Sequence, residues 1–83
     1  MNKQYQVKDV RKVFSNPNGR DYLLIAQDRD YGIVQDVNSF QIVVVWKLNL
    51  ENGDWGNGYY FEHKEMPEAV SFFKKKVRGA IWI

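Results

Sequence analysis

The feature that most constrains the fold is an alternating apolar stretch at residues 41–50, followed directly by turn residues. Side chains of a strand point alternately to its two faces, so this stretch predicts a strand with two distinct faces. One face would carry Ile42, Val44, Trp46, Leu48 and Leu50. The other would carry Val43, Val45, Lys47 and Asn49 and would become polar towards its end. The sequence Glu-Asn-Gly-Asp at residues 51–54 is a strong hairpin signal, so residues 59–62 are expected to pair back as the next strand.

The amino-terminal part of the chain has two interpretations. Between residues 5 and 14 the apolar side chains have helical spacing; they are Val7, Val10, Val13 and Phe14. The Asn-Pro-Asn-Gly sequence at residues 16–19 favours a strand, a tight turn and a strand, because proline presets φ and Asn-Gly supplies positive φ. The second strand would then occupy residues 22–26 inside the sheet. Residues 32–40 are expected to be irregular, with a turn at residues 36–39.

The best-marked element is a helix predicted at residues 67–78. Pro67 suits the first helical position, because its missing N–H would have no partner there. Glu65 and Glu68 complement the positive end of the helix, and Gly79 is a natural carboxy-terminal cap. One apolar stripe runs along the helix; it consists of Met66, Ala69, Val70, Phe73 and Val77, with Phe72 beside it.

These elements predict an α+β domain: an antiparallel sheet of about four strands with one C-terminal helix packed on one face. A short apolar tail, residues 80–83, would follow the helix. We expect the tail either to close the core of the monomer or, after a reversal at Gly79, to add an edge strand that meets a second chain in a homodimer.

Length and composition limit the class of protein. A chain of 83 residues makes one domain, residues 1–83, and buries only about 60–65% of the surface that its unfolded form exposes. The absence of cysteine excludes disulfides and thiolate metal sites. There is no apolar signal-peptide region near Met1, and the longest apolar run, residues 42–46, is far too short to span a bilayer. We therefore expect a soluble, cytoplasmic protein that does not contact a membrane.

The charge of the chain is unevenly distributed. The net charge is +2, but residues 1–20 carry +4, residues 21–68 carry −6 and residues 69–83 carry +4. The basic ends could neutralise the acidic middle within the fold, or they could form a basic face for an anionic partner.

No set of residues has the spacing of a catalytic or metal site. His63 is the only histidine, and none of the serines lies in the context of an activated nucleophile. Asp28, Asp30 and Asp36 lack the further ligands of a calcium loop, and the glycines at residues 53–58 do not match a phosphate loop. The sequence therefore predicts a protein that is not an enzyme and has no cofactor or metal.

Two groups of residues are candidates for binding a partner. Trp55 lies in a glycine-rich loop, where it could fold back onto Tyr59 or Tyr60 or be exposed for recognition. We take Trp55, Tyr60 and Trp82 as the candidate protein-binding residues. The basic end of the helix is the alternative, as a contact to the phosphates of nucleic acid; its residues are Lys74, Lys75, Lys76 and Arg78.

Between Val43 and Lys76 the chain resembles small uncharacterised proteins of phages and mobile elements from low-GC Gram-positive bacteria. The resemblance rests on an apolar strand that ends in tryptophan, on the sequence from Glu51 to Phe61, and on a short helix with the sequence Pro-Glu-Ala-Val at residues 67–70. It implies at most a host-takeover or anti-defence setting, and it identifies no site residue.

The small size, the many aromatic residues, the apolar tail and the lack of a catalytic set together indicate a non-enzymatic protein-binding module. Its partner would be an unidentified host protein, and it could act as an anti-defence inhibitor. The alternative is a nucleic-acid-binding protein that uses its basic N- and C-terminal segments.

Overall fold

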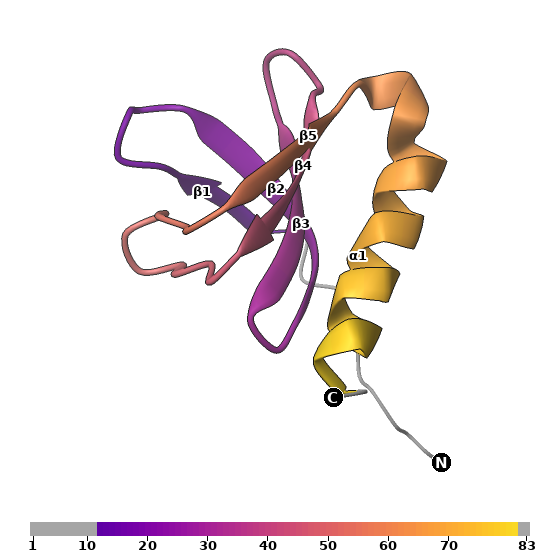
Figure 1. Cartoon of the computed structure of the whole chain (residues 1–83). Coiled ribbons are helices and arrows are strands. Elements are labelled where there is room, and N and C mark those ends of the chain that lie inside the picture. Colours follow the sequence, from indigo (N-terminus) through magenta and orange to yellow (C-terminus); the bar gives the residue numbers. More distant parts are fainter. Residues whose placement is uncertain (1–11, 82–83) are drawn as a thin grey trace.

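A computed structural model describes the backbone of residues 12–81, and side chains as far as Arg78. The described chain is an α+β fold, with one antiparallel sheet followed by a single helix at its C-terminal end (Figure 1). The strands are β1 (Lys12–Ser15), β2 (Asp21–Asp28), β3 (Tyr31–Asp36), β4 (Ile42–Trp46) and β5 (Gly58–Phe61). A 3-10 turn at His63–Glu65 leads into the helix α1, Met66–Ile81.

The sheet is a simple meander in which each strand pairs with the next along the chain. The predicted hairpin at residues 16–19 is confirmed, because it joins β1 to β2 in antiparallel register. Of residues 5–14, for which helix and strand were both open, residues 12–14 belong to β1, and residues 5–11 lie outside the described part of the chain. The turn predicted at residues 36–39 is also confirmed, since the side chain of Asp36 accepts hydrogen bonds from the backbone N–H groups of Asn38 and Ser39.

The sheet has five strands rather than about four, because β3 occupies residues that we expected to be irregular. Arg29 adopts a positive φ of 56°, which allows a two-residue turn to bring β3 back against β2. β3 then pairs with β4 on its other side, so it is a central strand. Its buried residues Ile33 and Val34 supply one side chain to each face of the sheet.

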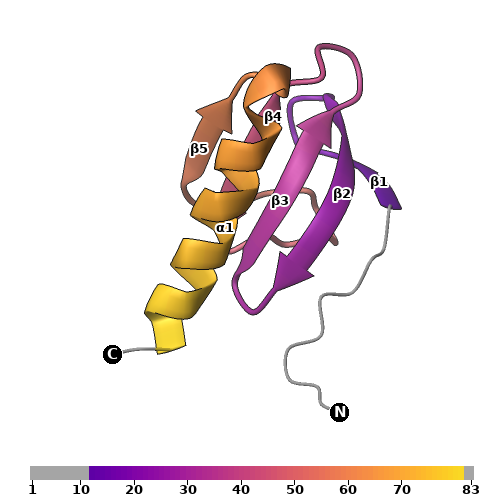
Figure 2. The ribbon, with the colours of Figure 1, turned by 90° about the vertical axis from the view of Figure 1, so that its right-hand side faces the viewer.

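The helix covers one face of the sheet, over β3, β4 and β5 (Figure 2). The predicted stripe forms this contact: Ala69, Phe73 and Val77 are buried against Ile33, Ile42 and Val44. Met66, Val70 and Phe72 are partly buried beside them.

Both ends of the helix differ from the prediction. The 3-10 turn precedes it, and the backbone N–H of Glu62 donates a hydrogen bond of 2.8 Å to Oε1 of Glu65. At the other end, Gly79 does not stop the helix, which continues to Ile81. The expected reversal at Gly79 is therefore wrong, and Ala80 and Ile81 belong to the last helical turn. Residues 82 and 83 lie outside the described part of the chain.

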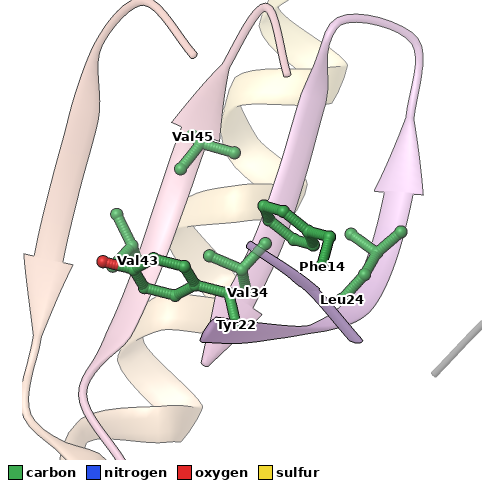
Figure 3. Close-up of a cluster of buried hydrophobic side chains, with 6 residues drawn as sticks. All are labelled: Phe14, Tyr22, Leu24, Val34, Val43 and Val45. Atoms are coloured by element: carbon green, nitrogen blue, oxygen red, sulfur yellow. The ribbon is translucent and has the colours of Figure 1, made fainter. Parts of the chain in front are cut away.

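The second face of the sheet has a core of its own, shown in Figure 3. It consists of Phe14, Tyr22, Leu24, Val34, Val43 and Val45. Leu48, Leu50 and Trp55, from the loop between β4 and β5, pack against it. Because α1 lies on the opposite face, it is this loop, among the residues described, that shields the second core from water.

The loop reaches this face because the strand predicted at residues 41–50 ends at Trp46. Lys47 has a positive φ of 59°, which breaks the alternation of the strand. As a result, Leu48 and Leu50 pack with Val43 and Val45, and not with Ile42 and Val44 as their spacing predicted.

A close backbone contact holds the loop in place. Gly53 has φ of +73°, and a Cβ atom built there would lie only 1.9 Å from the carbonyl oxygen of Ser15. The tip of the β4–β5 loop therefore rests directly on the end of β1. Only glycine permits this approach, because any side chain would have to occupy the position of the Ser15 carbonyl.

Within the described residues, α1 is the longest helix, and none is long and apolar enough to cross a membrane.

We predict that Phe73→Ala destabilises the protein by about 3–5 kcal/mol, since the ring is 6% exposed and its loss leaves a cavity between α1 and the sheet. The exposed Ser71→Ala on the same helix is the control and should change stability by less than about 0.5 kcal/mol. Denaturant unfolding measures both. If both variants unfolded at the same denaturant concentration, the apolar stripe of α1 would not be what packs the helix onto the sheet.

Candidate functional site

A groove of about 590 Å³ lies beside the second core. Its walls come from the β1–β2 turn, from the start of β2, from β5 and from the tip of the β4–β5 loop. The lining residues are Asn16, Pro17, Asn18, Arg20, Tyr22, Gln41, Gly53, Asp54, Trp55 and Tyr60. The volume falls within the range of ligand-binding pockets. In Figure 1 both the β1–β2 turn and the β4–β5 loop project away from α1, so the groove and the helix lie on opposite sides of the sheet.

Tyr22 and Trp55, which line this groove, belong to a row of aromatic rings that continues into the second core. The rings of Phe14 and Tyr22 stack at 5.9 Å between centroids, and Trp55 meets Tyr22 edge to face at 5.1 Å and 78°. Figure 3 shows the ring of Tyr22 extending from β2 to Val43 of β4. Trp55 is thus half-buried and held by a defined ring contact, although it comes from a loop.

Trp55 and Tyr60, both candidates from the sequence, lie side by side in the groove. A Cβ atom at Gly58 would be 3.2 Å from Nε1 of Trp55 and 3.1 Å from the hydroxyl oxygen of Tyr60. The two polar groups therefore converge on the same point, and glycine at residue 58 leaves them room. Tyr60 is 57% exposed, so its ring also presents a surface to solvent.

Asp36 lies behind the polar wall of the groove, where it contacts the lining residue Arg20. This carboxylate is 3% exposed and accepts hydrogen bonds from the backbone N–H groups of Asn38, at 2.8 Å, and Ser39, at 3.2 Å. Nη1 of Arg20 lies 3.4 Å from its other oxygen. The hydrogen bond from Asn38, together with those from Ser39 and the charge of Arg20, lowers the pKa of Asp36, although burial opposes this effect. Arg20 itself keeps a side chain that is 62% exposed.

The hydroxyl of Tyr22 lies between these groups. Burial raises the pKa of Tyr22, the negative charge of Asp36 raises it further, and Arg20 acts in the opposite direction. The hydroxyl of Tyr60 is close enough to contribute as well. Tyr22 therefore stays protonated at neutral pH and can serve as a hydrogen-bond donor in the groove.

The basic residues that form the alternative site lie on the other side of the sheet, on α1. Lys74, Lys75 and Arg78 are exposed. Lys76 is partly buried, and its Nζ lies 5.2 Å from the ring centroid of Tyr59 and 5.4 Å from that of Phe72. This lysine is thus engaged in cation–π contacts within the fold. Trp82, the third candidate for protein binding, lies outside the described residues.

The remaining polar candidates do not form a chemical site together. His63 contacts the side chain of Gln35 at 3.2 Å and the ring of Phe40, away from the groove. Among the described residues, no three acidic or histidine side chains are grouped so that they could hold a metal ion.

The polar half of the groove could not be predicted from the sequence. Arg20 and Tyr22 are near neighbours in sequence, but Gln41 joins them only through the pairing of β2 with β3 and the turn that follows β3. The one available signal was the uncommon tryptophan among glycines at Trp55, which identified one wall.

No protein-family model matches this sequence, and comparison with curated proteins and with solved structures found no significant match.

We predict that the stability of the protein depends on pH through Asp36. Its pKa is lowered in the folded state, so its contribution is complete above the unfolded pKa near 4 and is lost as the pH falls below that value. Asp36→Asn should cost about 1–3 kcal/mol at pH 7 and should flatten the loss of stability towards pH 3. Thermal melts of both proteins between pH 7 and pH 3 measure this. If the melting temperatures of the two proteins fell in parallel as the pH was lowered, the role assigned to Asp36 would be contradicted.

Proposed function

We propose that the protein is a non-enzymatic protein-binding module and that the groove is the surface with which it holds its partner. The observation that carries this proposal is the pairing of Trp55 and Tyr60 at one groove, with Arg20 and three amide side chains around them. Tryptophan, tyrosine and arginine are the residues that most often carry the binding energy of protein interfaces.

The way Trp55 is held supports the proposal. Its edge-to-face contact with Tyr22 and the anchoring of the loop by Gly53 fix the indole before any partner arrives. A side chain that is already ordered loses little conformational entropy on binding, so more of its contact energy appears as affinity. Packing alone would not require the neighbouring Tyr60, which is mostly exposed.

The polar groups near the groove support binding better than catalysis. The hydroxyl of Ser15 donates its hydrogen bond to Asp21, and a carboxylate is a poor substitute for the histidine base of known serine nucleophiles. His63 contacts Gln35 and Phe40, which do not line the groove. The donors that do line it are suited to recognition.

The resemblance to phage and mobile-element proteins suggests the setting of this proposal. In that setting the partner would be a host protein, and the module would inhibit or redirect it.

A contact between the basic end of α1 and nucleic acid is the alternative. The engagement of Lys76 with Tyr59 and Phe72 leaves fewer cations for phosphates on that side of the molecule, which is why we rank it second.

We predict that Tyr60→Ala weakens binding to the partner by about 30-fold or more, as expected for a hot-spot residue that contributes about 2 kcal/mol. Phe40→Ala is a matched control, because Phe40 is 55% exposed and lies outside the groove. Proteins captured from nuclease-treated bacterial lysate by the wild type would be purified, and their affinity for each variant measured.

The two variants separate the possible outcomes. Loss of binding in Tyr60→Ala with retention in Phe40→Ala supports the groove as the interface. Equal affinities for all three proteins would contradict it. Capture that disappears on nuclease treatment would promote nucleic acid to first place.

A further inference from the structure

We propose that the groove recognises a proline-rich segment of its partner, bound in the extended polyproline II conformation. This inference rests on the proposed function and adds the chemical class of the bound segment.

The aromatic wall presents hydrogen-bond donors. The indole Nε1–H of Trp55 can only donate, and the hydroxyl of Tyr60 beside it can donate as well. Both converge above Gly58. Among the described residues, neither group has a hydrogen-bond partner within the protein. A ligand that displaces water from this point satisfies both groups best when it brings acceptors to them.

The guanidinium of Arg20 adds further donors on the opposite wall. Its one contact to Asp36 is long, at 3.4 Å, and the two short hydrogen bonds to this carboxylate come from the backbone of Asn38 and Ser39. The guanidinium also lies beside the hydroxyl of Tyr22, but the side chain is 62% exposed, so part of its N–H groups can be offered to a ligand in the groove.

A proline-rich segment matches such a surface. Proline has no backbone N–H, so each proline offers only its carbonyl oxygen, an acceptor. In the polyproline II conformation these carbonyls make no internal hydrogen bonds and point outward to solvent. The proline rings pack on aromatic side chains, and the pre-formed helix loses little entropy on binding. Trp55 and Tyr60 provide both the rings and the donors.

The charge of the groove argues against a polyanion. Its lining contains one cation, Arg20, and one exposed carboxylate, Asp54, while the buried Asp36 adds a second negative charge behind Arg20. Binding to a nucleic-acid backbone depends on an excess of cations that neutralise phosphates. A ligand without net charge is therefore more complementary to this groove than a phosphate chain.

The test uses a capped ten-residue polyproline peptide as the probe and a capped Gly-Ser peptide of equal length as its control. Two-dimensional ¹⁵N–¹H NMR follows the indole N–H signal of Trp55, which is assigned by its disappearance in Trp55→Phe. We expect the polyproline peptide to shift this signal saturably. The Gly-Ser peptide, at the same concentrations, should leave it unchanged.

Conservative variants then test the two donors, with the affinity taken from shifts of backbone amide signals, because the indole signal of Trp55 is absent from Trp55→Phe. Trp55→Phe and Tyr60→Phe keep a ring but remove an N–H or O–H group, so each should weaken polyproline binding about three- to tenfold, as expected for one hydrogen bond. Trp46→Phe, outside the groove, should leave the affinity unchanged. A cooperative thermal melt for each phenylalanine variant would confirm that it is folded, although Trp55→Phe should melt at a lower temperature because Trp55 packs on the second core.

Three results would overturn the inference: no shift of the Trp55 signal, equal binding of the Gly-Ser peptide, or a shift produced by a single-stranded oligothymidine and not by polyproline. The inference can fail while the proposed function stands. A captured protein partner that depends on Tyr60, with no binding of polyproline, would mean that the groove binds protein of another chemistry.

Discussion

The contact between Gly53 and the carbonyl of Ser15 is the constraint on which the second half of the structure depends. A meander sheet has two faces, and the described part of the chain, residues 12–81, has one α-helix with which to cover them. The other face must be closed by a loop, and the loop can reach it only if its backbone lies directly on the end of β1. With glycine at residue 53, this approach is possible and Leu48, Leu50 and Trp55 complete the second core.

The same closure produces the groove. Once the loop rests on β1, Trp55 meets Tyr22, and the β1–β2 turn becomes the facing wall. The helix side of the sheet serves stability through Phe73 and its neighbours. The loop side serves both stability and, on our proposal, recognition. β4 lies between the two cores, and for this reason four consecutive residues, from Ile42 to Val45, are buried.

Local sequence patterns were sufficient to predict those elements whose determining residues lie close together in the chain. The stripe of α1, the hairpin at residues 16–19 and the turn at Asp36 could all be predicted, since in each case the determining residues are neighbours in sequence. β3 was missed because Gly32 and the polar residues around it weaken its alternation, while its stability comes from pairing with β2 and β4. The end of the helix was misplaced because Gly79 is compatible with a cap as well as with a helix.

The site was harder to predict than the fold. The positive φ of Lys47 reverses the facing of Leu48 and Leu50, and nothing in the spacing of the apolar residues reveals it. Trp55 and Tyr60 could be selected by residue type and position. Their proximity to Arg20 and Asp36 could not, because it depends on a backbone contact between two distant loops.

The free energies of unfolding of Gly53→Ala and Gly19→Ala, compared in the same denaturant titration, test the closure of the second face most directly. Both glycines have positive φ, 73° and 85°, so both variants lose about 1 kcal/mol or somewhat more from backbone strain. A Cβ atom at residue 19 meets nothing within 4 Å, whereas at residue 53 it meets the Ser15 carbonyl. We predict that Gly53→Ala is destabilised by at least about 2 kcal/mol more than Gly19→Ala, as expected for overpacking. Equal losses in the two variants would show that the loop does not rest on β1, and would contradict this account of the second core and of the groove.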